Sequence, residues 1–183
     1  MLEDSLVKSG VTARVLGYTT REPREGEING VDVNFLSEWE GQERYYADDS
    51  VQRLFYNDNY YGKNVADFEQ AFSKSNAVSC VVEPTGVAQI KTYAAKHNIA
   101  VVSYFISAPT KVMIERLMSR MRMDTNADPA YYAKRMQHLT EKEIFWGRDY
   151  AFTETLISKE HEDTQKLTQH IADHLQRLSC AYT

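Results

Sequence analysis

Cysteine is scarce in this sequence, and long hydrophobic runs are missing. The 183 residues include two cysteines, Cys80 and Cys180, and no Cys-x-x-Cys pair. Two cysteines are too few for a disulfide framework, which favours a reducing compartment, the cytoplasm. The longest apolar run, around residues 100–108, is too short to span a bilayer, and residues 1–10 place acids where a signal peptide has a basic region. Neither a disulfide-rich secreted domain nor a membrane protein is therefore expected.

Positive charge is also in deficit. Lysine and arginine total 21 against 26 aspartates and glutamates, which gives a formal net charge of −5. The overall field of the chain therefore does not favour nucleic acid as a partner. A length of 183 residues suits one domain with its own core. The sequence leaves the oligomeric state open, a homodimer included.

Strand-like and helix-like patterns alternate along the chain, which predicts an α/β protein with a parallel sheet flanked by helices. Two continuous apolar runs, 77–83 and 99–106, have the pattern of parallel strands that are buried on both faces. Further strands are expected at 12–18, 31–36 and 151–157, and a hairpin in the segment 44–61, which is rich in Tyr, Asn and Asp. Helices are expected at 3–9, from a Ser37–Glu40 capping box, at 65–73, from Thr85 to His97, from Thr110, from Asp128–Pro129 to Trp146, and over the leucines of 167–178.

A charged loop follows the first expected strand. Residues 21–27 read REPREGE, in which five of seven side chains are charged. Planar guanidinium groups match phosphate oxygens with paired hydrogen bonds, so Arg21 and Arg24, on a turn stiffened by Pro23, can bind one phosphate from two sides. The acids of the same run can orient the arginines when no ligand is present. The alternative is an ordinary solvated loop, which is what most charged runs are.

The spacing within this loop favours a specific interpretation. Residues 19–35, TTREPREGEINGVDVNF, resemble the guanylate kinase signature TTR-x-PR-x-GE-x-x-G-x-D-[YF]-x-F at ten fixed positions. The similarity covers most of residues 12–158, and the whole is similar to the divergent guanylate-kinase-like proteins of phage and bacterial genomes. Its further matches are Tyr61-Gly62, residues 81–91, 105–110 and 115–120, Lys134-Arg135 and Asp149-Tyr150.

The resemblance implies a fold and an activity. It implies one guanylate-kinase-like domain over residues 1–183, with a small mixed-β subdomain for a nucleoside monophosphate at about 18–62 and a helical lid at about 116–136. It also implies phosphoryl transfer from ATP, with its Mg²⁺, to GMP or a related nucleoside or deoxynucleoside monophosphate. Nucleoside monophosphate and ATP are thus the expected partners.

The resemblance also assigns roles to individual residues. Two loop arginines and one tyrosine would bind the acceptor phosphate, one acid would contact the substrate, and two lid arginines would act catalytically on the transferred phosphoryl group. The loop arginines are Arg21 and Arg24, and the tyrosine is Tyr61. The acid is Glu83, and the lid arginines are Arg120 and Arg135. Arg116 is a third lid candidate, and plain helix solvation is the alternative for all three lid arginines.

The motif that holds the donor's phosphates in this family is missing from the 183 residues. G-x-x-x-x-G-K-[ST] has no match, because the one Gly-Lys pair, Gly62-Lys63, is followed by Asn64. In the resembling fold, the strand before this motif lies between those expected at 77–83 and 99–106, so its loss would leave backbone groups unpaired. A truncated sequence, direct pairing of the flanking strands, or a strand from another chain would each resolve this, and we favour the first. The 183 residues alone are then expected to be inactive or nearly so.

The positions that recognise the base in the family also differ. The equivalent positions here carry Gly17, Val33, Gln52, Lys63 and Val81. A carboxylate can accept hydrogen bonds from the two adjacent N–H groups of guanine, and two such carboxylates are replaced. The sequence therefore leaves the acceptor base open. It also leaves open a second function, a non-catalytic guanylate-kinase-like module that binds a phosphorylated ligand or peptide.

Two histidines form a separate candidate site. His170 and His174 are four residues apart on the last expected helix, as a pair of metal ligands would be. The sequence places no third ligand nearby, so a solvated helix face is the favoured interpretation.

Overall fold

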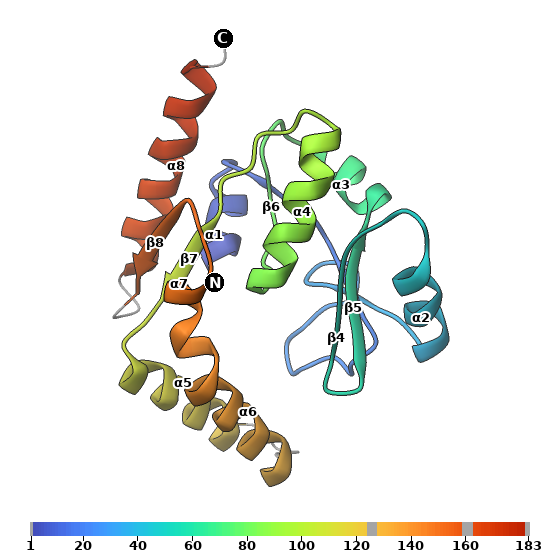
Figure 1. The fold of residues 1–183 in the computed structure, drawn as a ribbon, viewed down its shortest axis with the longest axis vertical. Helices are drawn as coiled ribbons and strands as arrows, with labels where there is room; N and C mark the ends of the chain where they lie inside the picture. The colour runs from blue at the N-terminus through green and yellow to red at the C-terminus, as the bar shows by residue number, and fades with distance from the viewer. Residues whose placement is uncertain (1, 124–127, 159–162, 182–183) are drawn as a thin grey trace. The chain divides into compact units, whose positions relative to one another are not determined.

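The computed structural model describes residues 2–123, 128–158 and 163–181. Their contacts form two compact units, residues 1–101 and 102–183, and each unit is described by itself. Helices accompany parallel and mixed strand pairs in these ranges, so the predicted α/β class is confirmed (Figure 1). No helix of the described ranges has the length and apolar character needed to cross a membrane.

The core of the first unit surrounds a short parallel strand pair. β1 (Ala13–Arg14) pairs with β6 (Val78–Ser79). α1 (Leu2–Lys8) precedes β1, α3 (Val65–Phe72) precedes β6, and α4 (Pro84–Lys96) follows β6. Buried Val15, Phe68 and Ile90 belong to one hydrophobic cluster, whose removal from water favours folding.

A four-stranded mixed sheet, in the order β3-β2-β5-β4, completes the first unit. Its strands are β2 (Tyr18–Thr19), β3 (Asn34–Phe35), β4 (Ser50–Tyr56) and β5 (Asn59–Asn64). β4 and β5 form the predicted hairpin, and its turn places Asn57 and Asp58 at φ 51° and 61°, which Asn and Asp tolerate. α2 (Glu38–Tyr46) begins with the predicted capping box between Ser37 and Glu40.

The edge strand β4 is protected by a side chain of α4. The Gln89 side chain accepts the backbone N–H of Arg53 at 2.7 Å and donates to the carbonyl of Arg53 at 3.3 Å. An edge strand otherwise exposes such groups to pairing with another chain. α4 and β4 are therefore fixed to each other by hydrogen bonds between a side chain and the main chain as well as by packing.

The second unit contains another parallel strand pair, β7 (Tyr104–Ser107) and β8 (Glu154–Ile157). Between them in sequence lie α5 (Thr110–Met123), α6 (Pro129–Glu141), the 3-10 turn η1 (Glu143–Phe145) and α7 (Trp146–Asp149). Asp128 caps α6 by accepting the N–H of Ala130 at 2.9 Å, as predicted. α8 (Asp163–Ala181) follows β8 and buries Ile171.

The two apolar runs are not the fully buried strands that the sequence predicts. β6 covers two residues of 77–83, and residues 99–103 lie outside any strand. Val81 is 65% exposed and Ile106 is 40% exposed. Within the described ranges, β6 pairs with β1 alone and β7 with β8 alone. Burial on both faces and long regular pairing require neighbours at both edges, which explains the difference.

Other predicted boundaries are also wrong. The strand expected at 12–18 is divided, because β1 pairs with β6 whereas β2 pairs with β3 and β5. The strand expected at 31–36 is reduced to β3. The backbone before β3 forms a turn, in which the N–H of Gly30 donates to the carbonyl of Val33 at 3.0 Å. The helix expected from Thr85 starts one residue earlier, with Glu83 as its N-cap. The helix expected to reach Trp146 ends at Glu141, before η1 and α7.

Candidate phosphate-binding site

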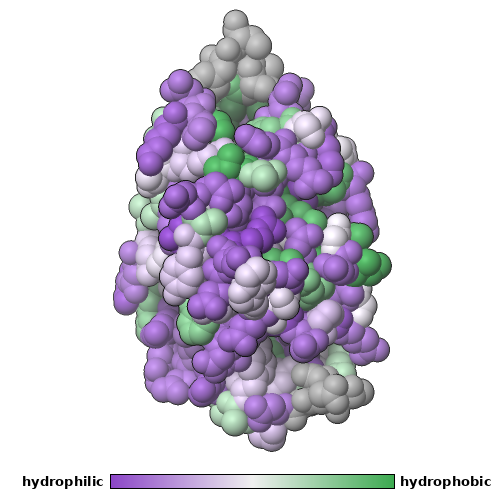
Figure 2. Space-filling model, turned by 90° about the vertical axis from the view of Figure 1, so that its right-hand side faces the viewer, coloured by the Kyte–Doolittle hydropathy of each residue, from purple (hydrophilic) through white to green (hydrophobic). Residues whose placement is uncertain are grey.

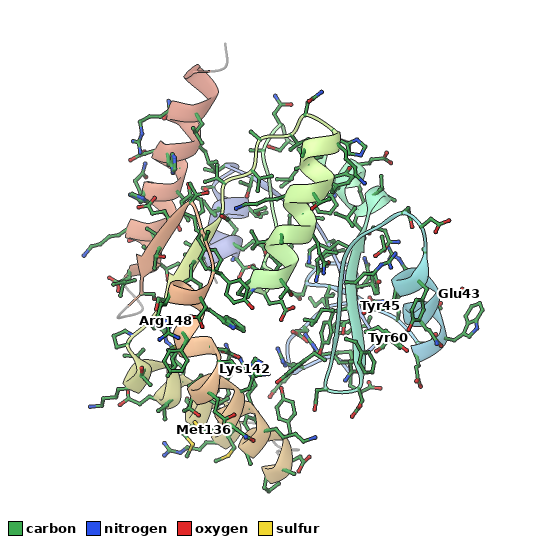
Figure 3. The ribbon with its side chains drawn as sticks, viewed as in Figure 1. Glu43, Tyr45, Tyr60, Met136, Lys142 and Arg148 are labelled. Carbon is green, nitrogen blue, oxygen red and sulfur yellow. The ribbon has the colours of Figure 1, made fainter. Side chains whose placement is uncertain are left out.

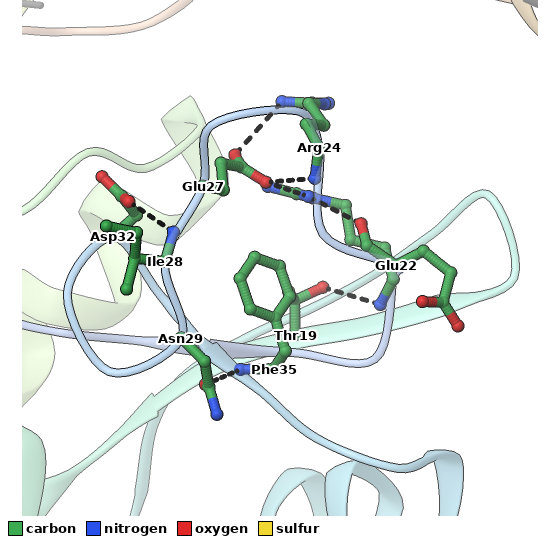
Figure 4. A network of polar contacts seen from close by, with 9 residues as sticks. Thr19, Glu22, Arg24, Glu27, Ile28, Asn29, Asp32 and Phe35 are labelled. Carbon is green, nitrogen blue, oxygen red and sulfur yellow. Dashed lines mark hydrogen bonds and ion pairs between the residues drawn. The ribbon is translucent and has the colours of Figure 1, made fainter. Parts of the chain in front are cut away.

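The loop between β2 and β3 is shaped by its own residues (Figure 4). Gly26 and Gly30 adopt φ of 81° and 75°, where a side chain would strain the backbone. The Asp32 carboxylate accepts the backbone N–H of Ile28 at 2.8 Å. These features fix the course of the loop before any ligand binds.

Both arginines of the loop are bonded to one carboxylate, that of Glu27. Arg21 donates to it through Nη1 at 2.7 Å and through Nη2 at 2.8 Å, which is a two-bond fork. Arg24 donates its backbone N–H to the same carboxylate at 2.8 Å, and its Nη1 lies 4.0 Å from it. The Arg21 hydrogen bond, more than any other contact, lowers the pKa of Glu27. Glu27 is therefore ionised at neutral pH, orients the guanidinium group of Arg21 and holds the backbone of Arg24.

The other two acids of the loop do not share this role. The carboxylates of Glu22 and Glu25 make no hydrogen bond or ion pair with the residues that the structure describes. Glu22 contributes its backbone carbonyl instead, which accepts from Nη1 of Arg21 at 2.9 Å. Of the three acids predicted to orient the arginines, Glu27 does so. The spacing of the sequence alone did not distinguish Glu27 from the other two.

The two arginines differ in exposure. The Arg21 side chain is 18% exposed, and its guanidinium lies 5.3 Å from the centre of the Phe35 ring. The Arg24 side chain is 61% exposed. Arg21 is thus held in place, whereas Arg24 keeps the side-chain freedom to close on a ligand.

Tyr61 lies on the face of the mixed sheet that is opposite α2. It pairs with Thr19 across β2 and β5, and directly opposed residues point to the same face. The other face packs on α2 at Gly41, where an added Cβ would come 2.1 Å from Cγ2 of Thr20 and 3.7 Å from Cβ of Tyr60. Tyr61 therefore shares its face with Thr19, two residues before Arg21. The structure thus places the predicted tyrosine and the start of the arginine loop on one side of the sheet.

Two further polar side chains lie on the face of Tyr61. Lys63 follows Tyr61 by two residues, which is roughly 7 Å along a strand, and Gln52 lies directly opposite Lys63 on β4. Gln52 is 4% exposed, and its amide has no hydrogen bond to the described residues. A Cβ at Gly86 would come 3.2 Å from Cγ of Gln52, so the missing side chain there lets Gln52 lie against the first turn of α4. Gln52 and Lys63 therefore place an amide and an ammonium group on the same face of the sheet as Tyr61.

Lys63 occupies the space beside Gly17. A Cβ at Gly17 would come 3.2 Å from both Cγ and Nζ of Lys63. The lysine ammonium donates to the carbonyl of Val81 at 3.4 Å, a long bond that leaves its other protons available. A side chain at residue 17 would therefore meet the carbonyl oxygen of Gly62, 2.8 Å from the added Cβ, as well as the lysine.

Glu83 stands at the amino end of α4. It is the N-cap residue of that helix, and the hydroxyl of Thr85 donates to its carboxylate. A negative charge at this end is favoured by the helix dipole. This local role explains the position of Glu83 without a ligand.

The lid arginines belong to the second unit, on helices α5 and α6, which contact each other. Arg120 lies in the last turn of α5, is exposed, and makes no hydrogen bond or ion pair with the described residues. Arg135 of α6 donates through both terminal nitrogens to Glu143, with Nη2 at 3.1 Å. Burial raises the pKa of Glu143, but hydrogen bonds from Arg135 and His138 outweigh it, so the pKa is lowered. Arg135 is thus held by an ionised partner, whereas Arg120 is not.

The two candidate metal ligands of the last helix have protein partners. His170 Nε2 lies 2.9 Å from Oε1 of Glu154, and Nδ1 of His174 lies 2.7 Å from the hydroxyl of Tyr104. No group of three or more His, Cys, Asp or Glu side chains in the described ranges is arranged to hold a metal ion. The histidines therefore attach α8 to the β7–β8 pair.

The fold and the paired arginines define a class, an α/β protein with a loop suited to phosphate. The family model for guanylate kinase matches residues 8–174, so the chain belongs to the guanylate kinase family. The guanylate kinase of Mycoplasmopsis pulmonis is 26% identical over 151 residues, which are 81% of this chain and 76% of that protein. The guanylate kinase of Latilactobacillus sakei is 27% identical over 161 residues, 87% of this chain and 75% of that protein. The crystal structure of guanylate kinase from Anaplasma phagocytophilum shares the fold, with a TM-score of 0.66 over 96% of this chain and 79% of that one, at 18% identity.

Proposed function

We propose that this chain carries the acceptor site and lid of a nucleoside monophosphate kinase of the guanylate kinase type, in the cytoplasm. The observation that carries the proposal is that one carboxylate holds the guanidinium group of Arg21 and the backbone N–H of Arg24, at the edge of the sheet face that bears Tyr61. A phosphate that carries two negative charges competes well with the single charge of Glu27 for both guanidinium groups. The phenol of Tyr61 would supply a further hydrogen bond to the same phosphate.

The reaction would join the bound acceptor to the terminal phosphoryl group of ATP. An oxygen of the acceptor phosphate forms a bond to the γ-phosphorus, the bond from that phosphorus to the bridging oxygen breaks, and ADP leaves. Mg²⁺ would arrive with ATP as part of that substrate. Arg120 and Arg135 would stabilise the charge that spreads over the transferred group, and Arg116, which donates to the Ser158 hydroxyl at 3.4 Å, is a third candidate. Glu83 would contact the substrate from the amino end of α4.

The donor site is not accounted for within residues 1–183. These residues contain no G-x-x-x-x-G-K-[ST] motif. We therefore expect the 183-residue polypeptide to bind the acceptor with little or no turnover.

The base of the acceptor would lie toward Gln52 and Lys63. These side chains follow Tyr61 along the same face of the sheet, so a nucleoside whose phosphate lies at Tyr61 can extend toward them. The ammonium of Lys63 only donates, whereas the amide of Gln52 donates and accepts. Guanine presents two adjacent N–H donors. The amide of Gln52 has one acceptor oxygen, so it does not pair with both of them as a carboxylate does. We therefore propose that guanine is not preferred over other bases.

Calorimetric titration of the chain with AMP, GMP, CMP, UMP and dTMP tests this proposal. We expect at least one of them to bind, and GMP not to exceed the others by more than about tenfold. A strong preference for GMP would contradict the base assignment alone. Failure of every nucleotide to bind would contradict the acceptor site itself.

A second candidate function is a binding module for a phosphorylated peptide. The neutral Gln52 at a position where the family carries a carboxylate, together with the missing donor motif, favours it. A phosphoserine peptide titrated in parallel with the nucleotides separates the two functions. Tighter binding of the peptide than of every nucleotide would favour the module.

A further inference from the structure

α2 presents an aromatic hollow to solvent. Trp39 and Tyr46 are 65% and 63% exposed, and with Gln42 and Glu43 they line one open hollow. The spacing of three, four and seven residues places all four on one face of the helix. Gly41 lies on another face, against the sheet. Two large exposed rings on the solvent side of a short helix contribute little to the core.

The rings continue from this hollow onto the β4–β5 hairpin. Ring centres lie 5.1 Å apart between Tyr46 and Tyr45, 5.1 Å apart between Tyr45 and Tyr60, and 4.8 Å apart between Tyr60 and Phe55. Phe55, at the far end, is 51% exposed. Trp39, Tyr46, Tyr45, Tyr60 and Phe55 are together called the aromatic row. Tyr60 and Tyr61 alternate across β5, so the row lies on the opposite face from the candidate phosphate site.

The figures show how the row is oriented. Tyr45 and Tyr60 lie between α2 and the β4–β5 hairpin, and Glu43 points away from the sheet (Figure 3). Hydrophilic residues predominate on the face of the molecule that carries α2 (Figure 2). Aromatic side chains are enriched at protein interfaces, whose rims are polar, so exposed rings beside polar surface are consistent with a contact site.

α2 contributes negative charge beside the row, and Arg53 of β4, which donates to the carbonyl of Ala47 at 2.7 Å, contributes a positive charge. α2 carries exposed Glu38, Glu40 and Glu43. The arginine of that helix, Arg44, is neutralised by two bonds of 3.0 Å to Asp67. Glu40 is engaged in the capping box, whereas Glu38 and Glu43 make no hydrogen bond or ion pair in the described part of the chain. Phosphate groups are repelled by such a surface, and cations are attracted to it.

We propose that the aromatic row, with Glu38 and Glu43, binds an arginine-containing segment of a partner protein. A guanidinium group can stack flat on an indole or phenol ring while its N–H groups form a fork with a carboxylate. The row already has one arginine at cation–π range, since Cζ of Arg53 lies 6.0 Å from the ring centre of Tyr45. A lysine would gain the charge attraction without the flat stacking. This surface does not depend on the proposed kinase function.

The test uses a fluorescently labelled peptide of alternating arginine and glycine, and a matched lysine peptide, in polarisation assays at about 0.15 M salt. We expect the arginine peptide to bind at least about tenfold more tightly than the lysine peptide. Trp39→Ala and Glu43→Lys should each weaken its binding by at least about tenfold and leave nucleotide binding unchanged. Tyr150→Ala and Glu141→Lys, at exposed positions of the second unit, are the matched controls and should have no effect.

A spectroscopic measurement locates the contact. The chain has two tryptophans, so in a Trp146→Phe background the fluorescence of Trp39 alone reports on the hollow. Its emission should change on addition of the arginine peptide and not of a matched glutamate peptide. Circular dichroism checks that each variant is folded, and Tyr46→Ala replaces Trp39→Ala if that variant is not.

Several outcomes would overturn the proposal. One is no binding of the arginine peptide up to about 1 mM, and another is equal binding of the lysine peptide. A third is binding that Trp39→Ala and Glu43→Lys leave unchanged. Sedimentation in which Trp39→Ala converts a dimer into a monomer, without peptide binding, would assign the row to a second copy of the chain instead.

Discussion

Replacement of the loop arginines has a predictable cost for nucleotide binding. Hydrogen bonds to a charged group contribute about 1.5–3 kcal/mol each, so Arg21→Ala should raise the Kd of the best-binding nucleoside monophosphate by roughly 10- to 150-fold. The Arg21 side chain is 18% exposed and held in a fork, so we expect Arg21→Ala to lie in the upper part of that range. The Arg24 side chain is 61% exposed, so we expect Arg24→Ala to lie in the lower part. Arg21→Lys keeps the charge but loses the fork, and it should fall between wild type and alanine.

Isothermal titration calorimetry measures these constants directly. Arg177→Ala, an exposed arginine on α8, is the control and should leave Kd unchanged. Circular dichroism spectra show whether each variant keeps the wild-type secondary structure. The reasoning fails if both loop variants change Kd by less than about twofold, or if the control changes it as much as they do.

Three further predictions concern the same unit. Gln52→Glu supplies the second acceptor that guanine needs. The ratio of GMP affinity to AMP affinity should therefore rise by about tenfold in competition titrations. An unchanged ratio would mean that Gln52 does not contact the base. Asp67→Ala removes a buried carboxylate that pairs with Arg44 and accepts the N-cap N–H of Asn64, so it should cost about 2–3 kcal/mol. The melting temperature should fall by roughly 5–10 °C, and a shift below about 1 °C would contradict this. Glu27 has a lowered pKa, so its contribution to stability is full above its ordinary value of 4.5 and is lost as the pH falls through the lower folded value. The melting temperature of Glu27→Gln should therefore fall less steeply with acid than that of wild type, and equal slopes would refute this.

The local features of the fold could be predicted from the sequence. The Ser37–Glu40 capping box and the Asp128 cap with Pro129 depend on residues three or fewer positions apart, and each is present. The turn at Asn57–Asp58 likewise follows from residues that tolerate positive φ. Such features need no knowledge of distant parts of the chain, which is why they were accessible.

The extent of the parallel strands could not be predicted in the same way. A run such as residues 77–83 carries the apolar side chains of a central strand, but its pairing depends on which segments reach its two edges. β6 has β1 at one edge and no second strand partner in the described residues. Exposed Val81 follows from that tertiary arrangement, because composition does not encode the neighbours of a strand.

The candidate site also has a part that depends on local sequence and a part that depends on tertiary pairing. Arg21, Arg24 and Glu27 lie within seven residues, so their association was open to sequence reasoning. Gln52 and Lys63 are brought face to face only by the register of β4 and β5, which shifts by one residue between Ser50 and Gln52. An irregularity of that kind moves side chains to the other face of a strand. The family resemblance named both positions, but their placement on the face of Tyr61 required coordinates.

Because the phosphate end and the base end of the acceptor site are built from different elements, we expect them to contribute independently to the binding free energy. The phosphate end is built from contacts within one loop and from Tyr61, and the base end is built from Gln52 and Lys63 across a strand pair, with no hydrogen bond between the two sets in the described residues. Substitutions that share no partner are additive in free energy. Arg21→Ala should therefore weaken all nucleoside monophosphates by one common factor, Gln52→Glu should reorder them, and the double variant should show the product of the two effects. Strong coupling between the two would mean that one group of the ligand contacts both residues, and the assignment of phosphate and base to opposite ends of this sheet face would be wrong.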